Sequence, residues 1–212
     1  MKKTIAAMVL AAAGAAFAET TPAMVSLVTP VQAPASDYDV EGIRLSLIYG
    51  ECGSFTGLDL GIANRARGYF YGLAVGGANI AEDRLYGGQL GLVNWNGSES
   101  STWANVSKGG QVGFVNYAGS SCGLQDGLIN IANGVFTGLQ SGFLNFSTHV
   151  NGVQCGAWFF LGVNAVEGTM HGCQLGLVNY AETVDRGVQI GLVNIISRGG
   201  WSPVLPLVNG SF

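Results

Sequence analysis

Apolar and small or polar residues alternate along most of the chain in a pattern that returns about every 15 residues. The clearest unit is Gly172 to Ala181, and near-copies occupy 87–96, 109–118, 123–132, 138–147 and 187–196. One alternating face of a unit carries Val, Leu or Phe and then Asn and Ala, while the other carries Gly, Gln, Gly, Val and a bulky residue. A period of two is typical of a β-strand, so each unit predicts one strand of about eight to ten residues and a turn.

Aligning the units on their Asn brings further columns into register. Gly lies seven and three positions before the Asn, and Gln lies five before it in most units. The columns are best defined by Gly87, Gln89, Gly91, Asn94, Gln111, Asn116, Gln174, Gly176, Asn179, Gln189, Gly191 and Asn194. Such regularity predicts a repeat architecture in which these residues have structural roles. The Asn amide is expected to satisfy backbone groups at a strand end.

One unit between 145 and 179 is degenerate, and either Phe159 or Asn164 fits its Asn position. About ten units and an alternating segment at 43–49 together predict an all-β domain of roughly eleven short strands. A segment at 204–212 is a worn final repeat. Its Pro206, with Pro203 just before it, would remove ladder donors, so this strand is expected at an edge.

Two arrangements can close the sheet. A straight nine-residue strand spans about 30 Å, and six remaining residues return at most about 20 Å, so a β-solenoid coil closes only if the strand bends. The central Gly would supply that bend. An antiparallel, closed or ring-like β-barrel avoids the problem and removes exposed edges. We therefore expect the barrel and keep the β-solenoid as the alternative.

Three segments divide the chain. Residues 1–18 join Lys2 and Lys3 to an apolar run that ends in Ala16-Phe17-Ala18, which predicts a cleaved signal peptide and export. Residues 19–40 hold three Pro residues without a sustained period and predict a flexible leader. The remaining 41–212 form a single β-repeat domain.

Charge and candidate chemistry exclude several classes of function. Without Lys2 and Lys3 the chain keeps seven basic and thirteen acidic residues, a net charge of −6 that disfavours a nucleic-acid partner. Both histidines, His149 and His171, fall in turn-like segments, and the Gly-rich stretches lack the Lys-Ser/Thr of a phosphate loop. We predict no catalytic residue, no metal ligand and no cofactor.

Cysteine and aromatic positions leave further alternatives open. An exported chain with four Cys permits two disulfides, and Cys155 and Cys173, in neighbouring units on the same face, are the best candidate pair. Aromatic residues share the position after the Asn, either as a stacked packing row or as a belt that contacts lipid or an apolar ligand. These residues are Trp95, Tyr117, Phe146 and Tyr180.

The Gly-x-Gln-x-Gly-Leu-Val-Asn units, the signal peptide and the closing Leu-Pro-Leu-Val-Asn-Gly-Ser-Phe resemble the bacterial Gly-rich surface-repeat proteins of uncharacterised function. The Gly-rich strands are also similar to the β-flower, a shallow barrel of short hairpins. This resemblance covers about 41–212 and implies a cell-envelope location without enzymatic activity. We expect a non-enzymatic protein of the periplasm, outer membrane or cell surface whose partners are membrane or envelope components. The alternative is a soluble binding module for an apolar or lipid-like ligand.

Overall fold

A computed structural model describes residues 19–97, 106–158 and 160–212, and the predicted signal peptide lies outside these residues. The described residues form strands and connecting turns, which confirms the all-β prediction. The strands are β1 (Thr20–Val28), β2 (Val31–Ala33), β3 (Asp39–Cys52), β4 (Phe55–Ala66), β5 (Phe70–Ala81), β6 (Leu85–Asn96), β7 (Ser107–Ala118), β8 (Ser121–Gly156), β9 (Val163–Leu175), β10 (Val178–Arg198) and β11 (Val204–Ser211).

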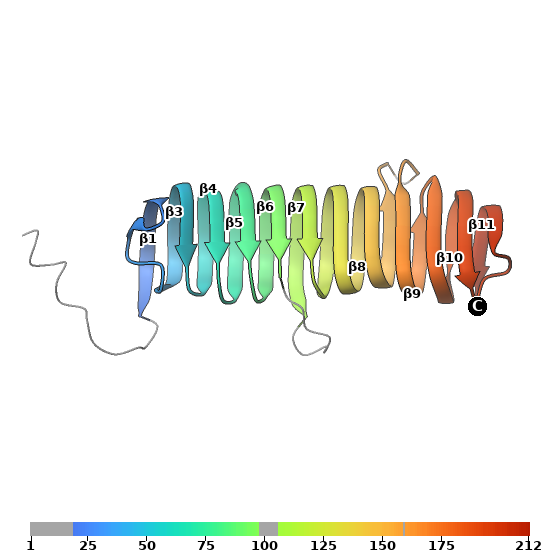
Figure 1. Cartoon of the computed structure of the whole chain (residues 1–212), viewed down its shortest axis with the longest axis horizontal. Coiled ribbons are helices and arrows are strands. Elements are labelled where there is room, and N and C mark those ends of the chain that lie inside the picture. The colour runs from blue at the N-terminus through green and yellow to red at the C-terminus, as the bar shows by residue number, and fades with distance from the viewer. Residues whose placement is uncertain (1–18, 98–105, 159) are drawn as a thin grey trace, which may run out of the picture.

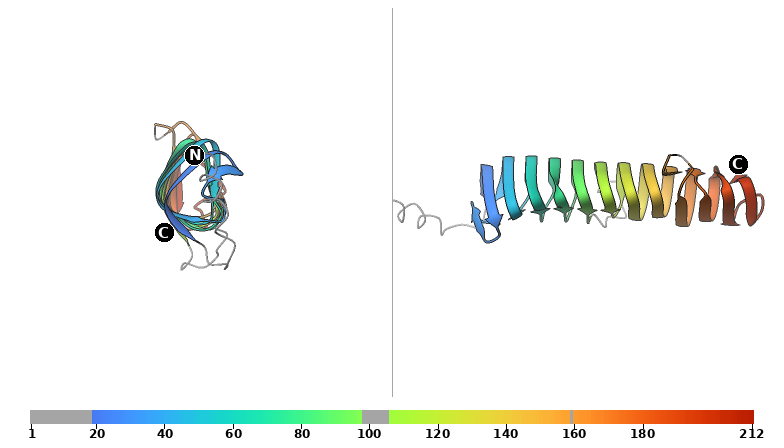
Figure 2. Two further views of the ribbon diagram at one scale, coloured as in Figure 1. Left: turned by 90° about the vertical axis from the view of Figure 1, so that its left-hand side faces the viewer. Right: turned by 90° about the horizontal axis from the view of Figure 1, so that it is seen from above.

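Parallel pairing between successive coils determines the architecture. From β3 to β10 each strand pairs in parallel with the next, in one 11-stranded sheet whose strand order follows the chain except at β1 and β2. Equivalent positions of the repeat face each other, as in Gly72↔Gly87 and Asn79↔Asn94. The coils stack into a rod with an oval cross-section (Figures 1 and 2). The antiparallel barrel that we expected is therefore wrong, and the β-solenoid alternative is the fold.

Glycine lets each strand turn the corner that a straight strand could not. Gly87 has a φ of 131°, which L side chains rarely adopt, and a Cβ there would lie 2.0 Å from the carbonyl oxygen of Gly72. Three residues before the Asn, a Cβ on Gly91 would lie 2.3 Å from the Gly76 oxygen and 2.7 Å from Nδ2 of Asn79. Both columns thus lie where the backbone of adjacent coils approaches most closely. The strand bends, and 15 residues complete a coil.

The interior of the rod is narrow and layered. Toward the N-terminus it is apolar, with Phe55 and Phe70 stacked at 4.9 Å between ring centroids. A second apolar cluster, which includes Met170 and Ile196, lies toward the C-terminus. Small residues such as Ala81 and Ala181 pack within these apolar clusters, and buried Gln and Asn side chains fill other interior positions. The core therefore combines apolar packing with two polar columns.

The two ends of the rod differ from its body. The predicted flexible leader is wrong in part, because β1 pairs in parallel with β3 and buries Met24 and Ser26, while the short β2 pairs antiparallel with β1. At the other end, β11 pairs antiparallel with β10, so Asn209 faces Gln189 and does not extend the Asn column. This terminal position confirms the expectation that the Pro-containing last strand lies at an edge.

Candidate functional site

The Asn column forms a continuous hydrogen-bonded ladder. Each Asn donates through Nδ2 to Oδ1 of the Asn in the next coil, as from Asn94 to Asn116 at 2.9 Å and from Asn179 to Asn194 at 2.8 Å. The same Nδ2 of Asn94 donates to the carbonyl oxygen of Val112 at 2.9 Å. That carbonyl belongs to the bend of the next coil, so the amide satisfies a backbone group at a corner, as the sequence predicts.

The Gln column forms a second ladder whose donors point the other way. Gln111 donates through Nε2 to Oε1 of Gln89 at 2.8 Å, and Gln189 donates to Gln174 at 2.7 Å. Gln89 also donates to the carbonyl oxygen of Trp95 in its own coil at 3.2 Å. The Gln side chains are buried, so an amide that lost its hydrogen bond would remain unsatisfied in the interior and lower the stability of the fold. The ladders hold adjacent coils in register and brace each coil internally.

The ladders end in groups that sequence inspection missed. Among the described residues, Asn64 Oδ1 at one end and Gln189 Oε1 at the other are buried acceptors without a donor. Toward the N-terminus the Gln column becomes Ala74, then Asp59 and Arg44, which form a buried two-pronged ion pair at 2.8 and 2.6 Å. Burial raises the pKa of Asp59, and Arg44 opposes that rise. The sequence signal for this ion pair is the presence of Arg44 and Asp59 at a repeat position that Gln fills in most later units.

The degenerate unit contributes Asn164 to the ladder. Asn145 donates to Asn164 at 2.8 Å, and Asn164 donates to Asn179 at 2.8 Å. Phe159, the alternative for this position, lies outside the described residues. A short loop joins the two halves of this unit, and Leu161 donates its backbone N–H to the Ala157 carbonyl at 2.9 Å. The degenerate unit therefore continues the Asn ladder, and its additional residues leave the coil as a loop.

The predicted cysteine pair is not bonded. All four cysteines are free thiols, and Cys173 faces Val153 while Cys155 faces Leu175. An offset of two residues between adjacent strands separates the Cα atoms by about 8 Å, more than a disulfide spans. Burial raises the pKa of both thiols, and in Cys173 the neighbouring Cys155 adds to the rise.

The two histidines lie in adjacent coils and contact different partners. His149 Nδ1 accepts a hydrogen bond from the Thr169 amide at 3.0 Å, while His171 Nδ1 lies 3.6 Å from Asp185 Oδ2 on the exposed surface. Within the described ranges, no three His, Cys, Asp or Glu side chains are placed to hold a metal ion.

The aromatic position behaves as a packing row only in part. Trp95 and Tyr117 stack at 4.1 Å between centroids with an interplanar angle of 15°. Phe146 and Tyr180 occupy the same register position in later coils, but Ile131 precedes Phe146 and Ala165 precedes Tyr180 in that column. The predicted stack is therefore confirmed for the first pair, and the later aromatics lie singly along the outer surface.

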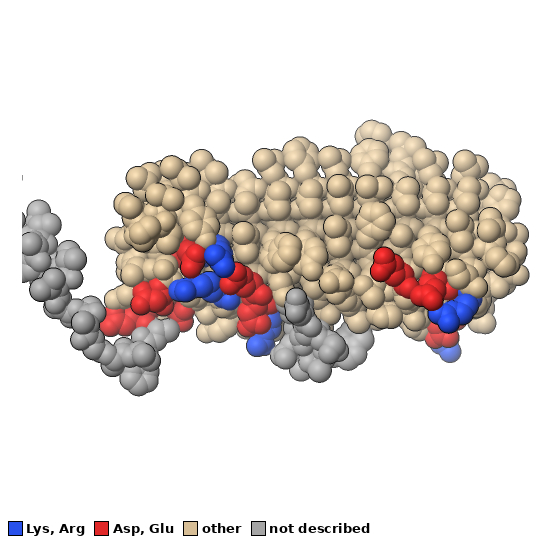
Figure 3. All heavy atoms as spheres, viewed as in Figure 1, with Lys and Arg blue, Asp and Glu red and all other residues tan. Residues whose placement is uncertain are grey.

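The outer wall is unusually apolar for a surface. One outer column, here called the leucine column, carries the exposed Leu58, Leu73, Leu124 and Leu139; Gly88 and Gly110 lie between Leu73 and Leu124, and Val188 occupies the same column in a later coil. A second, here called the outer ridge, comprises Ile62, Leu92, Phe114, Leu128, Phe143, Leu177 and Leu192. On the face in Figure 3, the charged side chains of the described residues gather in two patches along one edge, and the other described residues on this face are uncharged. Ion pairs at coil edges join Arg65 to Glu51 and Glu82, and Arg198 to Glu182.

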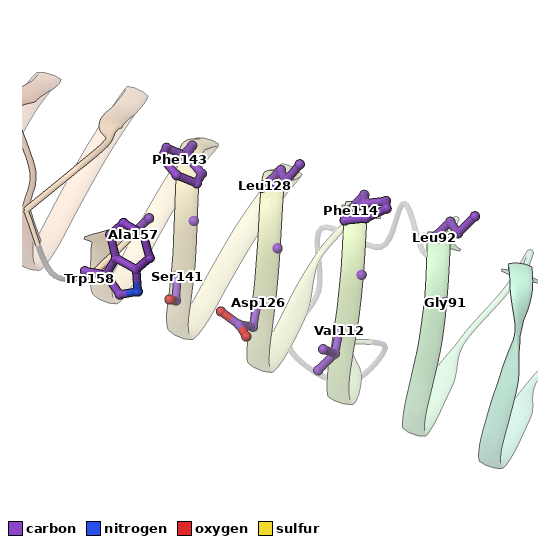
Figure 4. A pocket seen from close by; sticks show the side chains of 13 residues that line it. Gly91, Leu92, Val112, Phe114, Asp126, Leu128, Ser141, Phe143, Ala157 and Trp158 are labelled. Carbon is purple, nitrogen blue, oxygen red and sulfur yellow. The ribbon is translucent and has the colours of Figure 1, made fainter.

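A groove of about 600 Å³ runs along the wall across several coils. Its floor is the second glycine column, and one side is the part of the outer ridge from Leu92 to Phe143 (Figure 4). The opposite side carries Val112, Asp126 and Ser141, one from each successive coil, and Ala157 and Trp158 lie at one end. The volume falls within the range of small-molecule sites. This groove is the concave candidate site of the rod.

Comparison of the chain with protein-family models, curated proteins and solved structures gives no match. The resemblance to Gly-rich surface-repeat proteins therefore stays a prediction. Over the part of the chain that the structure describes, no helix has the length and hydropathy that crossing a membrane requires.

Proposed function

We propose that this protein is a non-enzymatic component of a bacterial cell envelope, exported through its N-terminal segment and associated with the outer membrane or cell surface through its apolar wall. The observation that carries the proposal is the pair of exposed apolar columns on a rod whose surface ion pairs lie at coil edges. Exposed apolar surface of this extent is typical of sites that meet a partner or a lipid surface.

The rod is suited to a structural or binding role. The Asn ladder ties the coils together from β4 to β10 and the Gln ladder does so from β6 to β10, so side chains on this part of the outer wall are presented at the regular spacing of about 4.8 Å between strands. A wall of this kind offers many equivalent shallow contacts and a site that extends over several coils. The leucine column would lie toward lipid or an apolar envelope component, and the charged edge toward water.

Fractionation of cells that export the protein tests this role. We expect the wild type in the membrane fraction after a high-salt wash, because apolar contacts persist when charges are screened. Leu73→Glu/Leu139→Glu places two charges on the leucine column, where both side chains are exposed, and is expected to release the protein. Asn133→Glu/Ser197→Glu adds the same charge at exposed polar positions and should leave the protein with the membrane. Wild-type protein found wholly in the soluble fraction would overturn the proposal.

A second role, as a soluble binding module for a lipid-like ligand, is favoured by one separate observation. The groove along the outer ridge is concave, mostly apolar and large enough for a small molecule. Co-purification of an extractable apolar ligand with the water-soluble protein would support this role. Purified protein that carries no such ligand and binds no alkyl probe would count against it.

A further inference from the structure

The groove lies where one column of the repeat changes from large apolar residues to polar ones. Along the column that forms its polar side, Leu60, Val75, Leu90 and Val112 are followed in successive coils by Asp126 and Ser141. These two substitutions replace large apolar side chains by a charge and by a small hydroxyl, and both line the groove. Departures from a regular pattern without a packing benefit are expected at functional positions. Here they open space and introduce one charge at the same place.

Asp126 is available to a ligand. Its side chain is exposed, and among the described residues its carboxylate makes no ion pair and no hydrogen bond. Every other described side chain that lines the groove is uncharged. A single carboxylate beside an apolar surface complements a ligand that carries a positive charge next to an apolar chain.

The floor of the groove favours an alkyl chain over a peptide. The carbonyl oxygens of Val112, Asp126 and Ser141 already accept hydrogen bonds from ladder Asn side chains at 2.9, 2.9 and 2.8 Å. A peptide lying along the groove would bring its own N–H and C=O groups to a surface with few free partners, at a desolvation cost. An alkyl chain brings no such groups and gains from apolar burial.

The end of the groove is marked by a strained aromatic residue. Trp158 has a φ of 50°, which is an outlier for a bulky residue, and its side chain is 80% exposed. It comes from the loop of the degenerate unit, and it lies beside Ser141 (Figure 4). An aromatic side chain at the end of a groove that also holds a carboxylate favours an organic cation as the ligand. Backbone strain at an exposed Trp needs a reason, and contact with a ligand supplies one.

We propose that the groove binds a single-chain amphiphile with a cationic head, its ammonium group at Asp126 and its alkyl chain along the outer ridge from Leu128 toward Leu92. Asp126 and Leu128 share a coil, and Leu92 lies two coils away, a distance of about 10 Å at the spacing of parallel strands. Primary ammonium is the preferred head, since Asp126 can accept its hydrogen bond and Ser141 lies in the adjacent coil. The inference deepens the second role proposed above and is independent of membrane association.

Isothermal titration of the purified full chain with decylammonium and decanoate below their micelle concentrations, and with decanol below its solubility limit, tests the proposal. We expect saturable binding of decylammonium by the wild type, weakened by added salt. Asp126→Asn should weaken that binding about tenfold, or about 1.4 kcal/mol, and leave the affinity for decanol unchanged. Ser141→Leu restores the apolar residue of the column, fills the groove and should abolish binding of every probe. Glu41→Gln, at an exposed acid in β3 outside the groove, is the matched control and should bind as the wild type does.

The outcomes separate this inference from the role on which it rests. Equal affinity for decylammonium, decanol and decanoate, blocked by Ser141→Leu, would overturn the cationic specificity and keep the binding-module role. Binding that survives Ser141→Leu would place the ligand elsewhere and overturn the site. No binding of any probe would overturn both, whereas cell fractionation does not test the groove.

Discussion

Replacing one amide in the middle of the Asn ladder should destabilise the rod strongly. Asn130 is fully buried and makes three ladder contacts. Its Nδ2 donates to the Ser141 carbonyl at 2.8 Å and to Asn145 Oδ1 at 2.8 Å, and its Oδ1 accepts from Asn116 Nδ2 at 2.8 Å. Asn130→Leu removes the amide and keeps a side chain of similar length. Three buried polar groups in neighbouring coils then lose a partner.

The magnitude follows from the number of orphaned groups. A buried donor or acceptor left unsatisfied costs about 1–3 kcal/mol. Asn116 keeps its second hydrogen bond, to the Asp126 carbonyl, so its loss is at the low end of that range. We therefore expect Asn130→Leu to lower the free energy of unfolding by about 3 kcal/mol or more.

Urea unfolding followed by circular dichroism measures this change. Because each coil contacts only its neighbours, the substitution is also expected to split unfolding into two transitions, one for each half of the rod. Asn133→Leu makes the same substitution at an exposed position three residues away and should change stability by less than about 0.5 kcal/mol. Equal and small effects of the two substitutions would refute the claim that the ladder carries stability.

Three further predictions follow from single buried contacts. Gly87→Ala should prevent folding or strongly lower the free energy of unfolding measured in urea, since φ is 131° and the new Cβ would lie 2.0 Å from a carbonyl oxygen. Gly110→Ala is the control: its new Cβ meets no atom closer than 3.9 Å, and the free energy of unfolding should hardly change. Asp59→Gln should lower the free energy of unfolding by about 3–5 kcal/mol, because it leaves Arg44 charged and buried without its partner. Adding Arg44→Gln should return the free energy of unfolding to within about 1 kcal/mol of the wild type. A double variant as unstable as the single variant would contradict this. Burial raises the pKa of the Cys52 thiol from 9.0 to about 12, so the folded state holds that proton more tightly than the unfolded state. Stability should therefore be full below about pH 9 and fall by about 1.4 kcal/mol per pH unit up to about pH 12. Cys52→Ala should lose this part of the alkaline dependence, and an unchanged profile would contradict the assignment.

The repeat pattern predicts the local structure of the rod well. The period of about 15 residues, the strand in each unit and the equivalence of Asn94 with Asn116 or of Gln174 with Gln189 are all visible in the sequence and are met by the register of the strands. Side-chain identity repeated at a fixed spacing is sufficient for this, because parallel coils bring like residues together. The ladder role of the Asn amide follows from the chemistry of the side chain alone.

Closure of the sheet could not be predicted in the same way. The same alternation of residues satisfies an antiparallel hairpin and a parallel coil, and the choice rests on whether the strand is straight. Gly87 and Gly91 lie where the backbone bends and where the next coil comes closest, a fact that only the three-dimensional register reveals. The order of the leader is not visible in the sequence, because Met24 and Ser26 are buried and lie in β1, which pairs with β3, without belonging to a recognisable repeat unit.

The groove had a signal in the sequence that becomes meaningful only with the register known. Asp126 and Ser141 occupy a column otherwise rich in Leu and Val, but a one-dimensional reading gives no reason to expect a concavity there. Its end depends on the loop that carries Trp158, which arises from the degenerate unit. Additional residues in a repeat leave the stacked coil as a loop, and the direction of that loop is a tertiary property.

Distances between spin labels along the leucine column test the solenoid most directly. Labels at Leu58 paired in turn with Leu124, Leu139 and Val188 span four, five and eight coils. At about 4.8 Å per coil the backbone separations should be about 19, 24 and 38 Å, increasing linearly with the number of coils. A separation that stops growing or becomes shorter for Val188 would mean that the strands return on themselves in a ring, and it would contradict the stacked coils.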